Sequence, residues 1–196
     1  MTTGIALVTG ATGGIGLDVA RQFAERGWTV LVGARDAARG AEVGAQFGGR
    51  PLVLDVTDAD SIATAAASVP ELDVLVNNAG ISLDTGAQIT ETDVELFRRT
   101  YETNVFGVVA VTNAFLPTLR RSAHPRIVNV SSGTGSLTWS TGPNPQFDYQ
   151  AAGTGSGAAY RSSKTALDAL TVFYAQALAG DRVKVTRSRR ACAPRT

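Results

Sequence analysis

Short, almost continuously apolar runs recur along the chain and alternate with stretches whose apolar residues are spaced as on a helix. The runs occupy residues 5–8, 30–32, 52–54, 74–76 and 127–130. Runs that are rich in β-branched residues and lack polar alternation are typical of strands buried on both faces of a sheet. They predict a parallel sheet whose strands are joined by helices.

The stretches between these runs predict the helices. Helical periodicity is found at residues 15–23, 58–68 and 94–119. Gly27 is placed to end the first helix, and Thr90 with Asp93 resembles a capping box before the third. Because crossovers between parallel strands are right-handed, this alternation predicts an α/β fold, a doubly wound sheet with helices on both faces.

Amino-acid composition is that of a single globular domain. A chain of 196 residues with 44% hydrophobic content suits one buried core, and no apolar run approaches the roughly 20 residues that a bilayer span requires. The chain enters its first strand without a charged and then apolar leader, so we expect a cytoplasmic protein with no membrane partner. Its single cysteine, Cys192, cannot form an internal disulfide.

Charge is unevenly distributed along the chain. Residues 182–196 hold six basic side chains and no acidic one, whereas residues 1–181 hold 12 basic and 17 acidic side chains. Such an end is commonly a solvated tail, and we disfavour the alternative that it binds nucleic acid. We therefore expect one domain over residues 1–186, followed by a basic, disordered tail over residues 187–196.

The segment 133–158 departs from the alternation of strands and helices, because it is dense in Gly, Pro, Ser and Thr. This composition predicts a long loop inserted in the domain. Loops of such length in compact domains are commonly lids or binding loops, although a plain surface insertion is the alternative.

The first predicted strand ends in a glycine-rich turn, in which Thr9-Gly10 is followed by Gly14 and Gly16. Glycines allow the backbone to approach a ligand closely, and the next helix presents its free N–H groups and positive dipole end to an anion. A phosphate is the expected ligand. A turn that only packs helix against strand is the alternative, because a lone glycine triplet is weak evidence.

This turn resembles the cofactor loop of the short-chain dehydrogenase/reductase family, and the resemblance continues in the same order along the chain. The further matches are Asn77-Asn78-Ala79-Gly80, Asn104, Ser132 and Tyr160-x-x-x-Lys164. The resemblance implies a Rossmann-type sheet of about six strands that binds NAD or NADP. It also implies that Asn104, Ser132, Tyr160 and Lys164 are the catalytic residues.

The same resemblance implies a set of cofactor contacts. They are Gly10, Thr12, Gly14, Ile15, Gly16, Arg35, Asp55, Val56, Asn78, Ala79, Gly80, Tyr160 and Lys164. Arg35 follows the second predicted strand, where a cation would accept the 2′-phosphate of NADP and a carboxylate would bind the 2′-hydroxyl of NAD. It favours NADP(H) over NAD(H), although Asp36 comes directly after it. Asp55 resembles the residue that meets the adenine amino group, and its alternative reading is a charge at the start of a helix.

Tyr160 and Lys164 lie four residues apart in a predicted helix, so they share one of its faces. A neighbouring ammonium lowers the pKa of a phenol from its ordinary value near 10, which allows Tyr160 to act as general acid or base. The resemblance implies that Lys164 also binds the nicotinamide ribose, that Ser132 binds the substrate oxygen, and that Asn104 holds a water chain. Taken singly, each could be an ordinary structural residue.

The sequence departs from the family at two places. Ser132 and Tyr160 are 28 positions apart, about twice the usual family interval, as in the carbonyl-reductase branch. The hypothesis for this insertion is that Trp139, Phe147 and Tyr149 line the substrate entrance. After Val185 the family's Pro-Gly pair is missing, so we expect a truncated sheet that lacks the usual last strand.

These observations predict an NADPH-dependent enzyme that reduces a ketone or aldehyde to an alcohol, or catalyses the reverse. The alternative is a catalytically weak or inactive NADP(H)-binding protein that acts as a sensor or scaffold. No cluster of His, Cys and carboxylates suggests a metal site. A small carbonyl or alcohol is the expected partner, and both a monomer and a homo-oligomer remain open.

Overall fold

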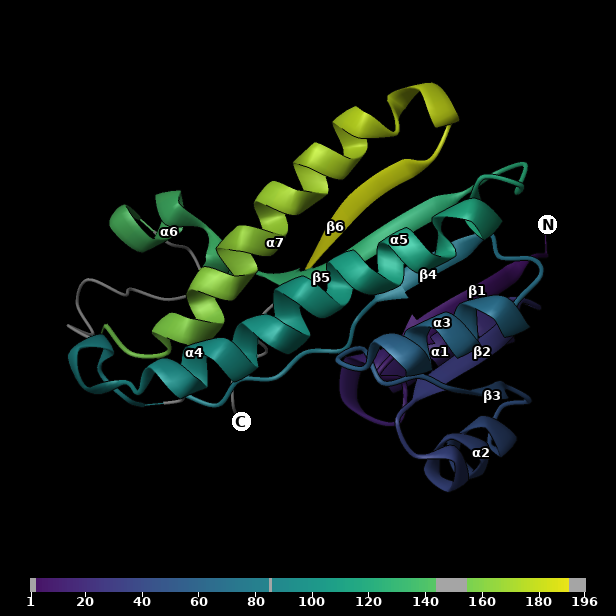
Figure 1. Ribbon diagram of the computed structural model, residues 1–196, viewed down its shortest axis with the longest axis horizontal. Helices are drawn as coiled ribbons and strands as arrows, with labels where there is room; N and C mark the ends of the chain where they lie inside the picture. The colour runs from purple at the N-terminus through teal and green to yellow at the C-terminus, as the bar shows by residue number, and fades with distance from the viewer. Residues whose placement is uncertain (1–2, 85, 144–154, 191–196) are drawn as a thin grey trace.

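Six parallel strands form one sheet in the order β3-β2-β1-β4-β5-β6 (Figure 1). The computed structural model describes residues 3–84, 86–143 and 155–190. The strands are β1 (Ile5–Thr9), β2 (Thr29–Ala34), β3 (Arg50–Val53), β4 (Val74–Asn77), β5 (Arg126–Ser132) and β6 (Lys184–Arg190). The predicted doubly wound α/β sheet is confirmed. Its strand order reverses between β1 and β4, which are neighbours in the sheet although two strands separate them in the chain.

Helices cover both faces of this sheet. They are α1 (Gly14–Glu25), α2 (Ala37–Ala45), α3 (Ala59–Ser68), α4 (Val94–Tyr101), α5 (Gly107–Leu119), α6 (Leu137–Thr141) and α7 (Ala158–Ala177). Alternate residues of β1 point to opposite faces of the sheet. Leu7 packs with the residues of α3 and α5, whereas Ala6 and Val8 pack with α1. The continuous apolar run of β1 follows from this burial on both sides.

The predicted helix over residues 94–119 is interrupted. A π-helical segment, η2 (Glu102–Phe106), separates α4 from α5. The predicted capping box is also wrong, since Thr90 lies in the 3-10 turn η1 (Ile89–Glu91). Asp93 is itself the N-cap, and its carboxylate accepts a hydrogen bond from the Glu95 amide at 2.9 Å.

The segment 133–158 is not a plain loop where the structure describes it. It contains the 3-10 turn η3 (Gly133–Gly135) and the short helix α6, while residues 144–154 lie outside the described residues. The last strand extends beyond residue 186, where the sequence predicts that the domain ends. β6 continues through Arg190, since its backbone pairs with β5 as far as Ser132. Cys192 lies outside the described residues.

The remaining short turn, η4 (Ala179–Asp181), connects α7 to β6. Within the described ranges, no helix combines the length and the apolar character that a membrane crossing demands.

Candidate active site

The predicted site residues gather at the carboxyl ends of β1, β4 and β5. Gly10 follows β1, Asn78 follows β4, and Ser132 ends β5. In doubly wound sheets, ligands bind outside the carboxyl ends of the strands where the strand order reverses. That point lies here between β1 and β4, so the topology places the glycine turn at the expected ligand site.

The glycine turn leaves space in front of α1. A Cβ atom on Gly14 would meet no atom within 4 Å, and its φ of +52° favours glycine. The helix begins at an N-cap, Gly13, that provides no side-chain hydrogen bond, and its first turn carries no acidic residue. The amides at this end are therefore available to an anion, which fits the diphosphate of a dinucleotide. Thr12 and Ile15, also predicted contacts, lie in the turn and in the first turn of α1.

The segment after β4 holds this turn in place. The Thr9 hydroxyl accepts hydrogen bonds from the amides of Asn78 and Ala79, both at 3.0 Å. The Asn78 side-chain amide donates in return to the carbonyls of Thr9 (2.9 Å) and Gly10 (3.2 Å). A Cβ on Gly16 would lie 2.3 Å from the Asn78 Nδ2, so the packing at this point requires glycine.

The residues that would discriminate the adenosine ribose lie after β2. Arg35 is exposed there, and no hydrogen bond or ion pair of its side chain is found within the described residues. The Asp36 carboxylate is engaged, because it caps α2 and accepts from the Arg39 amide at 2.8 Å. Because Asp36 is held in this cap, the Arg35 side chain is the more available of the two to a bound ribose or phosphate.

Asp55 and Val56 lie at the end of the segment that follows β3. The Asp55 carboxylate accepts from both the amide (2.9 Å) and the hydroxyl (2.8 Å) of Thr57. Asp58, rather than Asp55, caps α3 by accepting from the Ser61 amide at 2.8 Å. Val56 is buried, and its carbonyl would lie 2.6 Å from a Cβ on Gly107.

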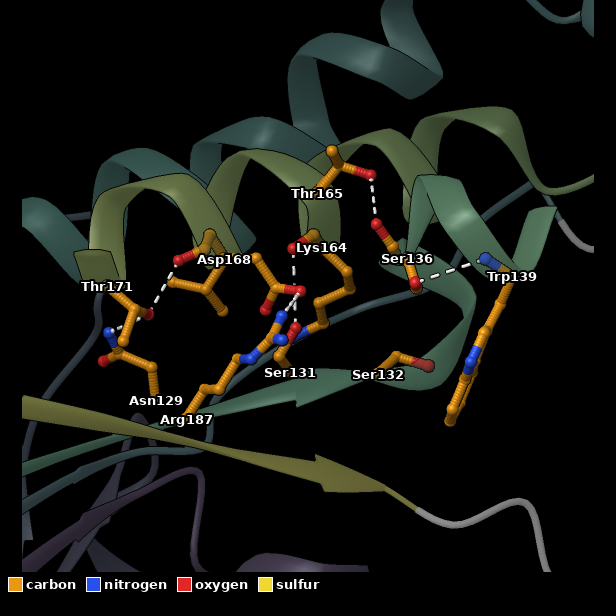
Figure 2. A network of polar contacts seen from close by, with 12 residues as sticks. Asn129, Ser131, Ser132, Ser136, Trp139, Lys164, Thr165, Asp168, Thr171 and Arg187 are labelled. Carbon is orange, nitrogen blue, oxygen red and sulfur yellow. Dashed lines mark hydrogen bonds and ion pairs between the residues drawn. The ribbon is translucent and has the colours of Figure 1, made fainter. Parts of the chain in front are cut away.

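Tyr160 and Lys164 lie on one side of α7. The Lys164 Nζ is 5.7 Å from the centroid of the Tyr160 ring. It also donates a hydrogen bond to the Val130 carbonyl at 2.8 Å, which directs the side chain toward β5 (Figure 2). A Cβ on Gly80 would lie 3.5 Å from this Nζ, so the segment after β4 reaches the same place. The structure thus brings the predicted phenol, the ammonium and the Asn77–Gly80 motif together.

Burial lowers the pKa of Lys164 from 10.5 to about 8, and the negative charge of Asp168 opposes this shift. The side chain is only 4% exposed. One turn further along α7, Asp168 forms an ion pair with Arg187 of β6. Figure 2 shows the three side chains between α7 and the strands below it. Sequence reasoning missed Asp168 and Arg187, because their pairing depends on how β6 lies against α7.

Ser132 is buried at the end of β5, where its hydroxyl contacts Thr134. Its Oγ accepts from the Thr134 amide (3.2 Å) and the Thr134 hydroxyl (2.9 Å). Across the described residues, no acceptor for the Ser132 hydroxyl is found. A serine hydroxyl both donates and accepts, so Ser132 can donate to a substrate oxygen that approaches it.

Asn104 lies within the π-helical segment and is completely buried. Its side-chain oxygen accepts from the Ile81 amide at 2.8 Å, and its Nδ2 donates to the Ile81 carbonyl (2.9 Å) and the Ser163 hydroxyl (3.0 Å). Ser163 in turn donates to the Tyr160 carbonyl at 2.7 Å. The Asn104 amide therefore joins the segment after β4 to the helix that carries Tyr160.

Two further polar residues hold the elements around the site together. Asn77, the first residue of the Asn77–Gly80 motif, donates from its side chain to Thr112 (3.0 Å) and Asn129 (2.9 Å) and connects β4 to α5 and β5. Asp84 accepts hydrogen bonds from the amides that open α7. Its partners are 75 and 76 residues away, so no local pattern could have found it.

Of the three residues predicted to line a substrate entrance, only Trp139 is described. It lies on α6, which is capped by Ser136, and Figure 2 shows its indole extending away from α7. Phe147 and Tyr149 lie outside the described residues.

One hollow of about 550 Å³ lies at the other end of β5 and β6, beside His124 and Lys184. Another of about 550 Å³ lies between α7 and β6, beside the Asp168–Arg187 ion pair. Within the described part of the chain, no group of three or more His, Cys, Asp or Glu residues could hold a metal ion. The candidate site is therefore identified from the positions of its side chains and of the glycine turn, and not from one of these hollows or from a metal site.

The sequence model of a known family covers most of the chain. The family described as short chain dehydrogenase matches residues 4–145. The chain belongs to the short-chain dehydrogenase family. Its Rossmann-type fold and the order of its motifs agree with this membership, so the resemblance seen in the sequence is confirmed.

Individual short-chain dehydrogenases are similar over different lengths. Short-chain dehydrogenase anuI of Penicillium roqueforti is 37% identical over 200 residues, which cover 94% of this chain and 77% of that protein. Serine 3-dehydrogenase of Agrobacterium fabrum is 37% identical over 138 residues, which cover 66% of this chain and 54% of that protein.

Solved structures of short-chain dehydrogenases have the same fold. One from Streptomyces avermitilis superposes with a TM-score of 0.79 at 31% identity and covers 98% of this chain and 68% of its own. A serine dehydrogenase complexed with NADP+ superposes with a TM-score of 0.80 at 29% identity and covers 94% of this chain and 71% of its own. Short-chain dehydrogenases are oxidoreductases that bind a nicotinamide cofactor, and this chain is an oxidoreductase of that family.

Proposed function

We propose that this protein is an NADP(H)-dependent oxidoreductase that reduces a ketone or aldehyde to an alcohol, or catalyses the reverse reaction. The observation that carries the proposal is the Tyr160–Lys164 pair, with the Lys164 Nζ 5.7 Å from the Tyr160 ring and close to Gly80, in the segment that bonds to the glycine turn. When bound, the nicotinamide supplies or accepts the hydride, and the protein provides placement and the proton.

Each of the remaining roles belongs to a side chain of this protein. Tyr160 donates its phenolic proton to the carbonyl oxygen in reduction and accepts a proton from the alcohol in oxidation. Lys164 stabilises the phenolate by its charge and hydrogen-bonds the nicotinamide ribose. Ser132 donates a hydrogen bond from its hydroxyl to the substrate oxygen, where negative charge develops.

The proposed preference for NADP(H) over NAD(H) rests on the residues that follow β2. The Arg35 guanidinium is exposed and would bind the 2′-phosphate of NADP(H), while Asp36 is engaged in the α2 cap. Two similar solved structures, a serine dehydrogenase and a gluconate 5-dehydrogenase, are complexes with NADP.

The experiment pairs a binding measurement with a turnover measurement. NADPH affinity is measured by fluorescence titration, and NADPH oxidation is then followed by absorbance with quinones, aromatic ketones and aldehydes. We expect Tyr160→Phe to bind NADPH as the parent does but to lose about 100-fold or more in kcat, since it cannot transfer a proton.

Tyr174→Phe is the matched control on the same helix. It removes a hydroxyl that donates to Asn113 at 2.8 Å, away from the predicted site, and we expect kcat to stay within about twofold of the parent. NADPH binding without any oxidation that depends on Tyr160 would instead identify a cofactor-binding protein that works as a sensor or scaffold.

A further inference from the structure

Helix α7, which carries Tyr160 and Lys164, has an N-cap residue that offers no side chain to its first amides. Its N-cap is Gly157, which has a left-handed φ of +70° and no side chain to accept a hydrogen bond. The first amides of a helix have no partner within it and need an acceptor from elsewhere. Tyr160 is the third residue of α7. A shift of the backbone in this first turn therefore also shifts the predicted general acid.

Asp84 supplies the missing acceptor from a distant part of the chain. Its Oδ2 accepts from the Ala159 amide at 2.6 Å, and its Oδ1 lies 3.4 Å from the Tyr160 amide. The residue is only 1% exposed. A buried carboxylate is stable only when it is paired or hydrogen-bonded, and the positive end of a helix favours it further. The positions of Asp84 and of the first turn of α7 therefore depend on each other.

The segment that delivers Asp84 also contacts the other parts of the site. Within residues 78–84, Asn78 bonds to the glycine turn and the Ile81 backbone bonds to Asn104. Asp84 makes the third attachment, to α7. Seven consecutive residues thus connect the predicted diphosphate site, the π-helical segment and the helix of Tyr160.

We propose that Asp84 is a positioning residue for the reaction, which fixes Tyr160 relative to the cofactor turn through the first amides of α7. This inference rests on the proposed function. Asp84 does not touch the reacting atoms; it acts by holding the backbone of Tyr160. A displacement of about 1 Å in a reacting group can cost on the order of 100-fold in rate, so the expected effect falls on kcat rather than on cofactor affinity.

The kinetic test compares Asp84→Ala and Asp84→Asn with the parent. Asp84→Ala removes both acceptors, and we expect a loss of about tenfold to 100-fold in kcat with the NADPH dissociation constant within about threefold of the parent. Asp84→Asn keeps one acceptor oxygen for the Ala159 amide, and we expect it to recover most of the lost kcat. Equal kcat values for parent and Asp84→Ala would overturn the proposal.

Asp93→Ala is the matched control, because Asp93 also caps a helix but α4 carries no predicted site residue. This variant shows the effect of losing a helix cap that does not hold Tyr160. We expect it to lower thermal stability while kcat stays within about twofold of the parent. If Asp84→Ala and Asp93→Ala lower kcat equally, Asp84 is an ordinary cap and the proposal is wrong.

Amide hydrogen exchange tests the same inference without turnover. In Asp84→Asn, the side-chain amide faces the Tyr160 N–H and cannot accept from it, so we expect faster exchange at Tyr160 while Ala159 stays protected. Unchanged exchange at Tyr160 would overturn the inference, even if Asp84→Ala does not fold. If the parent reduces no carbonyl, the proposed function fails, and the exchange result still decides whether Asp84 holds this turn.

Discussion

Lys164 makes the stability of the cofactor-free protein depend on pH. Burial lowers the pKa of its ammonium to about 8 in the folded chain, against an ordinary value of 10.5. The unfolded chain therefore binds more protons between these two values, and the free energy of unfolding rises as pH increases through this interval. Below pH 8 the folded protein carries the full cost of a buried ammonium.

We expect Lys164→Met to remove this rise. The rise in the free energy of unfolding is at most about 3–4 kcal/mol, because the pKa falls from 10.5 to about 8 and each pKa unit corresponds to about 1.4 kcal/mol. Urea unfolding of parent and variant on either side of pH 8 measures the difference, and Lys184→Met at an exposed position is the control. A parent and a Lys164→Met variant with the same pH dependence would show that burial does not shift this lysine.

Arg35 is the residue on which the proposed cofactor preference depends. We expect Arg35→Ser to lower NADPH affinity by about tenfold to 100-fold, since a hydrogen bond to a charged group contributes about 1.5–3 kcal/mol. NADH affinity should change little, because NADH has no 2′-phosphate. Arg26→Ser, at the far end of α1, is the control, and fluorescence titration with both cofactors is the measurement. A parallel loss for NADPH and NADH would assign Arg35 a structural role instead.

At the scale of elements, the role of the β1–α1 turn can be tested by comparing Gly14, at the start of α1, with Gly48, in a turn before β3. Gly14 and Gly48 both have positive φ, and a Cβ on either would meet no atom within 4 Å. Alanine at each position should cost about 1–2 kcal/mol in stability from the left-handed backbone alone. Only Gly14→Ala should also lower NADPH affinity, by about tenfold or more, because its Cβ enters the space in front of α1.

Thermal unfolding and NADPH titration of the two variants decide this point. If Gly48→Ala weakens NADPH binding as much as Gly14→Ala does, the space in front of α1 is not the diphosphate site.

The strands and most helices could be predicted from the sequence because their signals are local. Buried strands carry continuous apolar runs, and Gly27, with φ +80°, follows α1 as expected. The π-helical segment could not be predicted, since one extra residue barely disturbs the apolar spacing of 94–119. Helix α6 was hidden in a segment rich in Gly, Ser and Thr, where one serine cap, Ser136, starts a helix of five residues.

At the scale of the whole molecule, the sheet explains why some site residues were predictable and others were not. Thr9, Asn78 and Ser132 follow or end apolar runs, so the parallel arrangement places them at one edge from sequence alone. Asp84 and Arg187 act through partners on α7 that are distant in sequence, and only the packing of the complete domain brings them together. The residues that local sequence patterns predict lie at strand ends or, like Tyr160 and Lys164, at helical spacing on one helix.

The outermost position of β6 has a consequence for how copies of this protein meet. Within the described residues β6 pairs only with β5, so the backbone of its other edge could template a further strand. Lys184 is exposed on this strand, and a charged side chain on an edge strand disfavours pairing with the same edge of a second copy.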